Sequence, residues 1–350
     1  MASRTYIISQ PHPYLDYTLD GLSQDSEYVV LHHRRKKSLK ATITRFIRHL
    51  LPGRHRGLWT RSILPDDYLE VLKEIGPEDK VIFWSIGNLK DIRIIKEETD
   101  AASYTAMILD PLRQICHFSE RELKSYPERM SSLGVKVCTF DKQDAERHGL
   151  TYVGQVYRYP DMERPDATAI EERDNDGKIL FIGIDKRRAE KLNSLITILE
   201  NERVPYDFRI LYDHHSERGR YPLLDRCELK EPLPYQEVLR LSERSHCLVD
   251  ILQPGQTGLT MRALEALFFG KKLITDNIGI RDERFYHPDN IFIIDNSNSR
   301  SEERGVHPAS EKSEGRVEQR TLRQFLDTPL SPIDAEIIKQ YDIRSWIKRL

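Results

Sequence analysis

The chain has 350 residues, of which 39% are hydrophobic and 31% are charged, and its formal net charge at pH 7 is −2. This is the composition of a soluble globular protein, and the length suits two domains that each bury a core of their own. The small net charge excludes a general polyanion binder, and no apolar run approaches the roughly 20 residues of a membrane-spanning helix.

The start of the chain and its cysteines both indicate a cytoplasmic protein. The first residues lead directly into a short apolar run, without the apolar region of a signal peptide. Four cysteines, at 116, 138, 227 and 247, are scattered and lack metal-binding or redox spacing. We therefore expect free thiols in a reducing compartment, with Cys116, Cys138 and Cys247 buried.

In the first half of the chain, short apolar runs alternate with stretches of helical periodicity. The periodic stretches predict helices over 67–75, 89–99 and 120–133. The apolar runs predict strands at 6–9, 28–31, 81–84, 106–109 and 135–140. This alternation favours βα units and a mainly parallel sheet.

Residues 32–65 differ from the rest because they hold ten Lys or Arg, four His and no acid. Leu39, Ile43, Phe46, Ile47, Leu50 and Leu51 recur within them at helical spacing, which predicts a basic amphipathic helix. Such a segment suits an anionic inner-membrane surface or a phosphorylated lipid acceptor. A core-packing helix with a solvated basic face remains the alternative, and we expect no nucleic-acid partner because no recognised nucleic-acid module is present.

A proline- and charge-rich stretch at 161–177 is the best candidate linker. After it, helices are expected over 186–201, 234–244 and 259–269, and residues 296–320 read as a mobile polar loop. Strands are expected at 179–182, 207–211, 248–252, 273–275 and 291–294. The predicted fold class is therefore α/β, with two Rossmann-like domains, 1–160 and 178–340, facing a central cleft, and a closing helix at 341–350.

The most informative segment is 247–275, which reads as strand, glycine turn, helix, glycine stop and strand. A loop such as 254–258 at a helix N-terminus suits phosphate, because free N–H groups and the helix dipole converge there. Arg262 and Glu265 lie one turn apart on that helix and can face one ligand. Glu265 can accept hydrogen bonds from ribose hydroxyls, and the alternatives are a surface carboxylate for Glu265 and a helical salt bridge for Arg262.

The pattern Gly258-x6-Glu265-Ala266-x3-Gly270-Lys-Lys-Leu-Ile-Thr resembles the nucleotide-sugar signature of GT-B glycosyltransferases. More narrowly, the chain resembles bacterial glycosyltransferases of lipopolysaccharide and capsule assembly, in which a glutamine- and glycine-containing loop precedes a Thr-x-Arg-x-x-Glu-Ala helix. The likeness extends through Phe83-Trp84-Ser85-Ile86-Gly87-Asn88, Asp110-Pro111, 139–141 and 341–347, and so covers most of the chain. Only one glutamate of the usual spaced pair is present, which leaves retaining and inverting chemistry both open.

This resemblance implies a nucleotide-sugar donor, no cofactor, and a glycan or glycolipid acceptor. The turn after the strand at 179–182 would bring basic groups to the donor phosphates, although a solvated helix start is the alternative. The expected nucleotide-binding residues are Gly183, Lys186, Arg188, Gln256, Thr257, Gly258, Leu259, Thr260, Arg262 and Glu265.

Inverting transfer needs a group that takes the acceptor proton, and three residues of the first domain are candidates. They are Asp16, His12 and Asp110, each just after a predicted strand. The alternatives are a helix N-cap for Asp16 and a turn residue for His12. Asp174-Asn175-Asp176 matches a D-x-D metal motif but precedes Gly177, so we read it as a turn and expect no metal.

Two other functions stay open at this point. One is a different transferase that works in the same kind of cleft, such as one that moves a phosphopolyol from a cytidine nucleotide. The other is a GT-B-like scaffold without catalysis.

Overall fold

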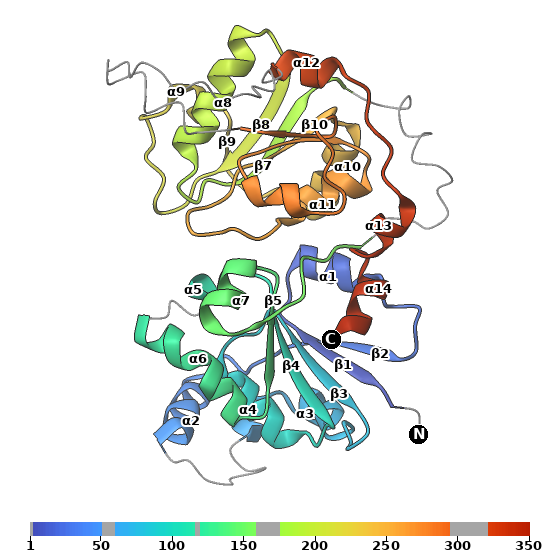
Figure 1. Cartoon of the computed structure of the whole chain (residues 1–350). Coiled ribbons are helices and arrows are strands. Elements are labelled where there is room, and N and C mark those ends of the chain that lie inside the picture. The colour runs from blue at the N-terminus through green and yellow to red at the C-terminus, as the bar shows by residue number, and fades with distance from the viewer. Residues whose placement is uncertain (1–2, 51–59, 116–119, 159–175, 295–320) are drawn as a thin grey trace, which may run out of the picture. The chain divides into compact units, whose positions relative to one another are not determined.

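A computed structural model describes residues 3–50, 60–115, 120–158, 176–294 and 321–350. These residues form two compact units (Figure 1). Unit 1 comprises Met1–Arg158 and Ile343–Leu350, and unit 2 comprises Tyr159–Asp342. Most of the predicted linker at 161–177, the polar segment at 296–320 and Cys116 lie outside the described residues.

Unit 1 is built on a parallel sheet in the order β2-β1-β3-β4-β5-β6. Five strands coincide with predicted apolar runs, and the two-residue edge strand β6 was not predicted. The strands are β1 (Thr5–Ser9), β2 (Tyr28–His32), β3 (Lys80–Trp84), β4 (Ser103–Ile108), β5 (Lys136–Thr139) and β6 (Thr151–Tyr152).

Helices cover both faces of this sheet (Figure 1). One core cluster includes Phe83, Ile92 and Tyr126, so α3, α4 and α6 pack on one face. The other face carries α1 and the C-terminal residues. The helical segments are α1 (Pro13–Asp20), α2 (Leu39–Leu50), η1 (Thr60–Ser62), α3 (Asp66–Lys73), α4 (Leu89–Glu98), α5 (Leu112–Ile115), α6 (Glu120–Ser132) and α7 (Lys142–His148).

The last eight residues return to unit 1 as α14 (Ile343–Trp346) and η5 (Ile347–Arg349), two short pieces where one helix was predicted. The N–H of Ile343 donates to Tyr157 O at 2.8 Å. Trp346 is buried, meets Trp84 edge to face with ring centroids 5.7 Å apart, and donates its indole N–H to Val153 O at 3.0 Å. These residues therefore complete the second core cluster of unit 1.

Unit 2 repeats the architecture with a parallel sheet in the order β12-β11-β10-β7-β8-β9. Its strands are β7 (Ile179–Ile184), β8 (Tyr206–Leu211), β9 (Glu228–Leu229), β10 (Cys247–Asp250), β11 (Lys272–Thr275) and β12 (Ile291–Ile293). Its helical segments are α8 (Ala189–Asn201), α9 (Pro222–Asp225), α10 (Tyr235–Arg244), α11 (Met261–Phe268), η3 (Ile278–Asp282), α12 (Leu322–Asp327) and α13 (Ala335–Lys339).

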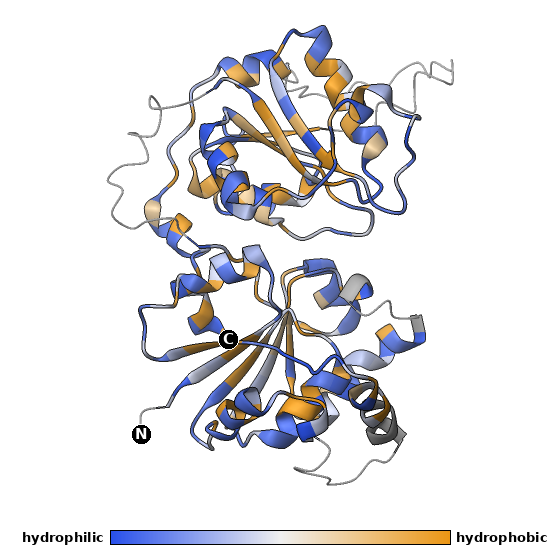
Figure 2. Ribbon diagram, turned by 180° about the vertical axis from the view of Figure 1, so that it is seen from behind, coloured by the Kyte–Doolittle hydropathy of each residue, from blue (hydrophilic) through white to orange (hydrophobic). Residues whose placement is uncertain are grey.

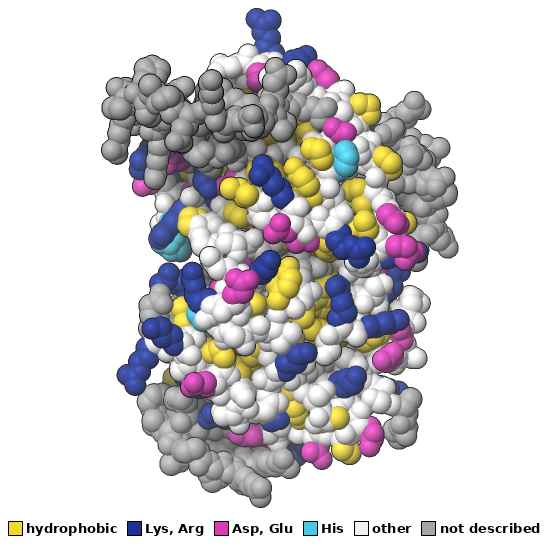
Figure 3. All heavy atoms as spheres, viewed as in Figure 1, with side chains coloured by type: hydrophobic (Ala, Val, Ile, Leu, Met, Phe, Trp, Pro, Cys, Tyr) yellow, Lys and Arg dark blue, Asp and Glu magenta, His cyan; other side chains and the backbone are white. Residues whose placement is uncertain are grey.

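The distribution of polar and apolar residues follows from these layers. The strands are largely hydrophobic, whereas polar residues recur along the outer faces of the helices (Figure 2), as expected for parallel strands buried on both faces. Cys138 and Cys247 are buried free thiols, as predicted. Figure 3 shows charges of both signs interspersed on the visible face. Among the described residues, no helix is long and apolar enough to span a bilayer.

Candidate functional site

In unit 2, the parallel strands β7, β10 and β11 bring their carboxyl ends to one edge of the sheet. The loop after β10 begins α11, where Thr260 is the N-cap residue and accepts a hydrogen bond from the N–H of Ala263 at 3.2 Å. Gly255 has a φ of 83°, which favours glycine, and so allows the turn. The amide of Asn277, after β11, donates to Gly258 O at 3.5 Å. The predicted loop Gln256, Thr257, Gly258, Leu259 therefore leads directly into a capped helix.

Arg262 and Glu265 are paired with each other and with the strand ends. Arg262 forms an ion pair with Glu265, and its guanidinium also donates to Ser242 Oγ at 2.9 Å and to Ile182 O at 3.1 Å. Glu265 is only 3% exposed and accepts a hydrogen bond from the hydroxyl of Tyr235 at 3.1 Å. The helical salt bridge, which was the alternative for Arg262, is thus present, and the alternative of a surface carboxylate at Glu265 is wrong.

Arg188 ties two strand ends together. Its guanidinium donates to Ile251 O at 2.7 Å, to Asp185 O at 3.0 Å and to Ile184 O. Burial lowers the pKa of Arg188, and the carboxylates of Asp250 and Asp185 partly oppose that shift. All three guanidinium nitrogens thus bind backbone carbonyls, which makes this arginine a structural bridge between the loops after β7 and β10.

The turn before Arg188 presents two other cations. Lys186 and Arg187 have φ angles of 46° and 63°, a left-handed conformation that few residues other than glycine adopt. Arg187 is exposed, and its guanidinium lies 3.3 Å from Nδ1 of His215. A Cβ at Gly183 would lie 3.2 Å from the guanidinium of Arg188, so glycine makes room there. Strained backbone of this kind concentrates at functional sites, and no sequence pattern marks it here.

Asp250, at the end of β10, is a further residue that the sequence analysis did not single out. It is 3% exposed, and its Oδ2 has no hydrogen-bond partner among the described residues. Burial raises the pKa of this carboxyl to about 6, although a hydrogen bond from Thr260 and the charge of Arg188 oppose the shift. In the sequence, this residue could have been found as an aspartate that ends an otherwise apolar strand.

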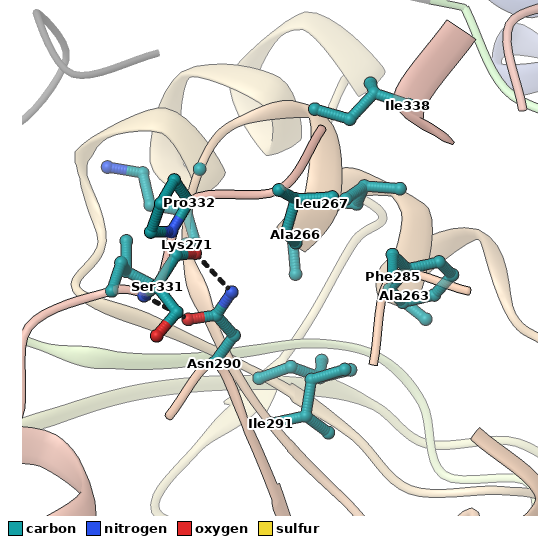
Figure 4. Close-up of a pocket in the computed structure, with 14 residues that line it drawn as sticks. Ala263, Ala266, Leu267, Lys271, Phe285, Asn290, Ile291, Ser331, Pro332 and Ile338 are labelled. Atoms are coloured by element: carbon teal, nitrogen blue, oxygen red, sulfur yellow. Dashed lines mark hydrogen bonds between the residues drawn. The ribbon is translucent and has the colours of Figure 1, made fainter. Parts of the chain in front are cut away.

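A different face of α11 borders an apolar cavity of about 220 Å³ (Figure 4). Ala263, Ala266 and Leu267 line it from the helix. Two hydrogen bonds of 2.8 Å between Asn290 and Ser331 lie at its edge. None of the predicted nucleotide-binding residues lines this cavity, so it is separate from the candidate nucleotide site.

In unit 1, the three candidate bases occupy the carboxyl edge of the sheet. His12 is the exposed N-cap residue of α1, and its ring centroid lies 4.4 Å from that of Tyr14. Asp16 lies in the first turn of α1, where an oxygen is 3.6 Å from His32 Nδ1, so the N-cap alternative for Asp16 is wrong. Burial, together with the charge of Asp110, raises the pKa of Tyr14. His12 and Asp16 therefore lie at the start of α1, after β1, whereas Asp110 follows β4.

The D-x-D alternative is described only in part. Asp176 accepts a hydrogen bond from the N–H of Lys178 at 3.0 Å, and Gly177 has a φ of 71°. This is a turn at that end of the motif. Among the described residues, no group of three or more His, Cys, Asp or Glu side chains is arranged to hold a metal ion.

The sequence matches no known family model, and a search of curated proteins finds no relative. Among solved structures, the N-terminal domain of Candida albicans trehalose-6-phosphate phosphatase is 11% identical with a TM-score of 0.54, covering 100% of this chain and 96% of that one. AviGT4, a glycosyltransferase of avilamycin A biosynthesis, is 10% identical with a TM-score of 0.46, and the coverages are 99% and 93%. The α,α-trehalose 6-phosphate synthase from Burkholderia multivorans is 11% identical with a TM-score of 0.43, covering 81% of this chain and 84% of that one.

The fold is of the GT-B type. The likeness to the Candida domain spans both units, and each unit has the parallel sheet and alternating helices of a Rossmann-like domain. The lower two scores do not add to this conclusion. The predicted α/β fold class is thus confirmed.

Proposed function

We propose that this protein is a glycosyltransferase that moves a sugar from a nucleotide-sugar donor to a glycan or glycolipid acceptor. The observation that carries this proposal is the edge of the unit 2 sheet. There the capped loop before α11 and the turn with half-buried Lys186 and exposed Arg187 follow the paired strands β10 and β7. Backbone N–H groups and fixed cations are what a nucleotide diphosphate requires. The GT-B fold and the signature from Gly258 to Gly270 support the same assignment.

Within this proposal, Gln256 to Thr260 hold the donor phosphates and Glu265 lies toward the ribose. Lys186 and Arg187 read the charge of the diphosphate, while Arg188 and Arg262 fix the strand ends around it. If the reaction inverts the anomeric centre, Asp16, His12 or Asp110 takes the acceptor proton. We propose further that the transferred group is a hexosyl or related sugar, without metal or other cofactor, and that the acceptor belongs to lipopolysaccharide or capsule.

A thermal-shift screen with UDP, GDP, CDP, TDP and CMP tests the donor assignment. A nucleotide that binds only the folded state stabilises it by mass action, by about 2.7 kcal/mol at 100 times Kd. We expect one base to raise the melting temperature in proportion to the logarithm of concentration. Mass spectrometry of the product then separates sugar transfer from phosphopolyol transfer. A protein that no nucleotide stabilises would be a scaffold without this activity.

We also propose that residues 32–65 place the protein on an anionic inner-membrane surface. Leu39 and Ile43, one turn apart on α2, are 78% and 49% exposed in a segment rich in lysine and arginine. Co-sedimentation with liposomes should rise with anionic lipid and fall with salt, because charge screening shortens to about 8 Å at physiological ionic strength. Binding that ignores lipid charge would exclude this role and leave a soluble enzyme.

A further inference from the structure

Unit 1 contains a cavity of about 700 Å³ between the end of β1 and the start of α2. Its walls include Gln10, Pro11, His33, Arg35, Lys36 and Lys37, and none of the described residues that line it is acidic. We call it the basic pocket. Its size is in the range of small-molecule sites, so it can hold a phosphorylated sugar or a headgroup.

Buried side chains behind the pocket wall hold Arg35 in position. Its guanidinium forms an ion pair with Asp91, which is 3% exposed, and its Nε–H donates to His33 Nε2 at 3.0 Å. Because Nε2 accepts, the proton of a neutral His33 is on Nδ1, which lies 3.5 Å from the hydroxyl of Tyr68. Two buried groups, Asp91 and His33, thus orient one arginine whose side chain is still 34% exposed. Such support from behind preorganises a binding group.

The neighbouring cations differ in how they are neutralised. Arg34 forms an ion pair with Asp67 at 2.6 Å. The amine of Lys36 donates to Arg61 O at 2.7 Å and lies 3.4 Å from Asp66. Lys37 is exposed and has no partner in the part of the chain that the structure describes. The positive charge that remains available to a ligand therefore lies at Lys37, beside the fixed guanidinium of Arg35.

The backbone of this wall is fixed as well. The N–H of His33 donates to Ser9 O at 2.7 Å, and the N–H of Lys36 donates to Ile63 O at 2.8 Å. The first bond continues the pairing of β2 with β1, and the second ties the wall to the residue after η1. Pro11, which also lines the basic pocket, directly precedes His12, so a molecule in the pocket lies next to the segment that carries this candidate base.

We propose that the basic pocket binds a phosphate group of the acceptor, so that the acceptor is a phosphorylated glycan or a lipid with a phosphate headgroup. The acceptor role rests on the proposed function, whereas phosphate binding does not. An arginine with a fixed planar guanidinium recognises phosphate geometry, and a lysine beside it adds a point charge.

Hydrogen exchange of the full chain with inorganic phosphate, and separately with UDP, tests this assignment. We compare Arg35→Lys with Lys37→Ser against the matched pair Arg34→Lys with Lys40→Ser, which changes the same charges outside the pocket walls. Phosphate should slow exchange of amides 33–42 in the wild type and in the control pair. The pocket pair should need about tenfold more phosphate for the same protection. Melting temperatures of both pairs confirm that each is folded.

Equal phosphate dependence in the two pairs, or no protection at 33–42, would overturn the proposal. UDP should protect 183–188 and 253–263 instead, so failure of the donor assignment is visible separately. Vesicles with phosphatidic acid and soluble glucose 1-phosphate identify the source of the phosphate. Weaker vesicle binding by the pocket pair alone indicates a lipid headgroup, and a loss confined to glucose 1-phosphate indicates a soluble phosphorylated glycan.

Discussion

At the edge of the unit 2 sheet, the charged side chains bind mainly to the protein itself, whereas those of unit 1 are left more open. Arg188 and Arg262 donate to strand-end carbonyls, and Glu265 is buried between Arg262 and Tyr235. In unit 1, Asp16 is 41% exposed and its nearest cationic partner, His32, is 47% exposed. A charged residue at a strand end can therefore be part of the structural framework, so its contacts decide its role.

The largest effect should come from the open edge. Asp16→Asn should lower turnover about 10²- to 10⁴-fold if Asp16 is the general base, because an amide cannot take a proton. Donor-nucleotide affinity should not change. Asp20→Asn, on the same helix and paired with Arg158, is the control and should stay active. Full activity of Asp16→Asn would exclude Asp16 as the general base and leave His12, Asp110 or a retaining reaction.

Removing a buried charge from the unit 2 edge should lower the stability of the fold. Arg262→Ala leaves Glu265 buried without its cation, which should lower the unfolding free energy by about 3–5 kcal/mol in urea titrations. Arg240→Ala breaks an exposed pair with Glu237 at the same helical spacing and should lower the unfolding free energy much less. If both variants lose equal stability, the buried pair is not the framework described above.

The pH dependence of the unfolding free energy shows how Asp250 contributes to the same edge of the sheet. Its folded pKa of about 6 lies above the ordinary 3.8, so the folded state binds the proton more tightly. The unfolding free energy should therefore fall as pH rises from about 4 to about 6, by roughly 3 kcal/mol. Asp250→Asn should weaken this dependence of stability on pH, measured by melting curves at several pH values. Asp67→Asn changes an exposed carboxylate and should leave the fall in stability in place. An unchanged slope in the first variant would exclude Asp250 as its source.

The smallest effect should come from the turn in unit 2 that holds half-buried Lys186 and exposed Arg187. Lys186→Ala with Arg187→Ala should weaken nucleoside diphosphate binding by about 1–3 kcal/mol by calorimetry and leave bare nucleoside binding and the melting temperature unchanged. Arg203→Ala, also at a positive φ of 55° but at the other end of α8, should change neither. Equal losses for nucleoside and diphosphate would show that the turn does not read phosphate.

The strands were predictable because buried parallel strands are continuous apolar runs, as in β3 and β7. The edge strands β6 and β9 are two residues long and largely exposed or half-buried, so no pattern marks them. Helix α1 was missed because Pro11-His12-Pro13 reads as a turn, although proline at the first helical position favours a helix start.

At the candidate site, the sequence predicted where charged residues gather but not which way they face. Adjacent arginines at 187 and 188 look alike in sequence, and the left-handed backbone at 186 and 187 separates an exposed guanidinium from a bridging one. Asp91 and His33 lie 58 residues apart in the chain, so their joint support of Arg35 depends on tertiary contacts that spacing cannot reveal.

The return of the chain to unit 1 has a consequence for synthesis on the ribosome. Trp346 covers Trp84, yet it is translated after the whole of unit 2, about 10 to 40 s after Arg158 at roughly 5–20 residues per second. Until then, one face of the unit 1 sheet lacks part of its cover, and Trp84 lacks the ring that packs against it. Unit 1 is begun first and completed last, so a ribosome that stalls within unit 2 leaves both units unfinished.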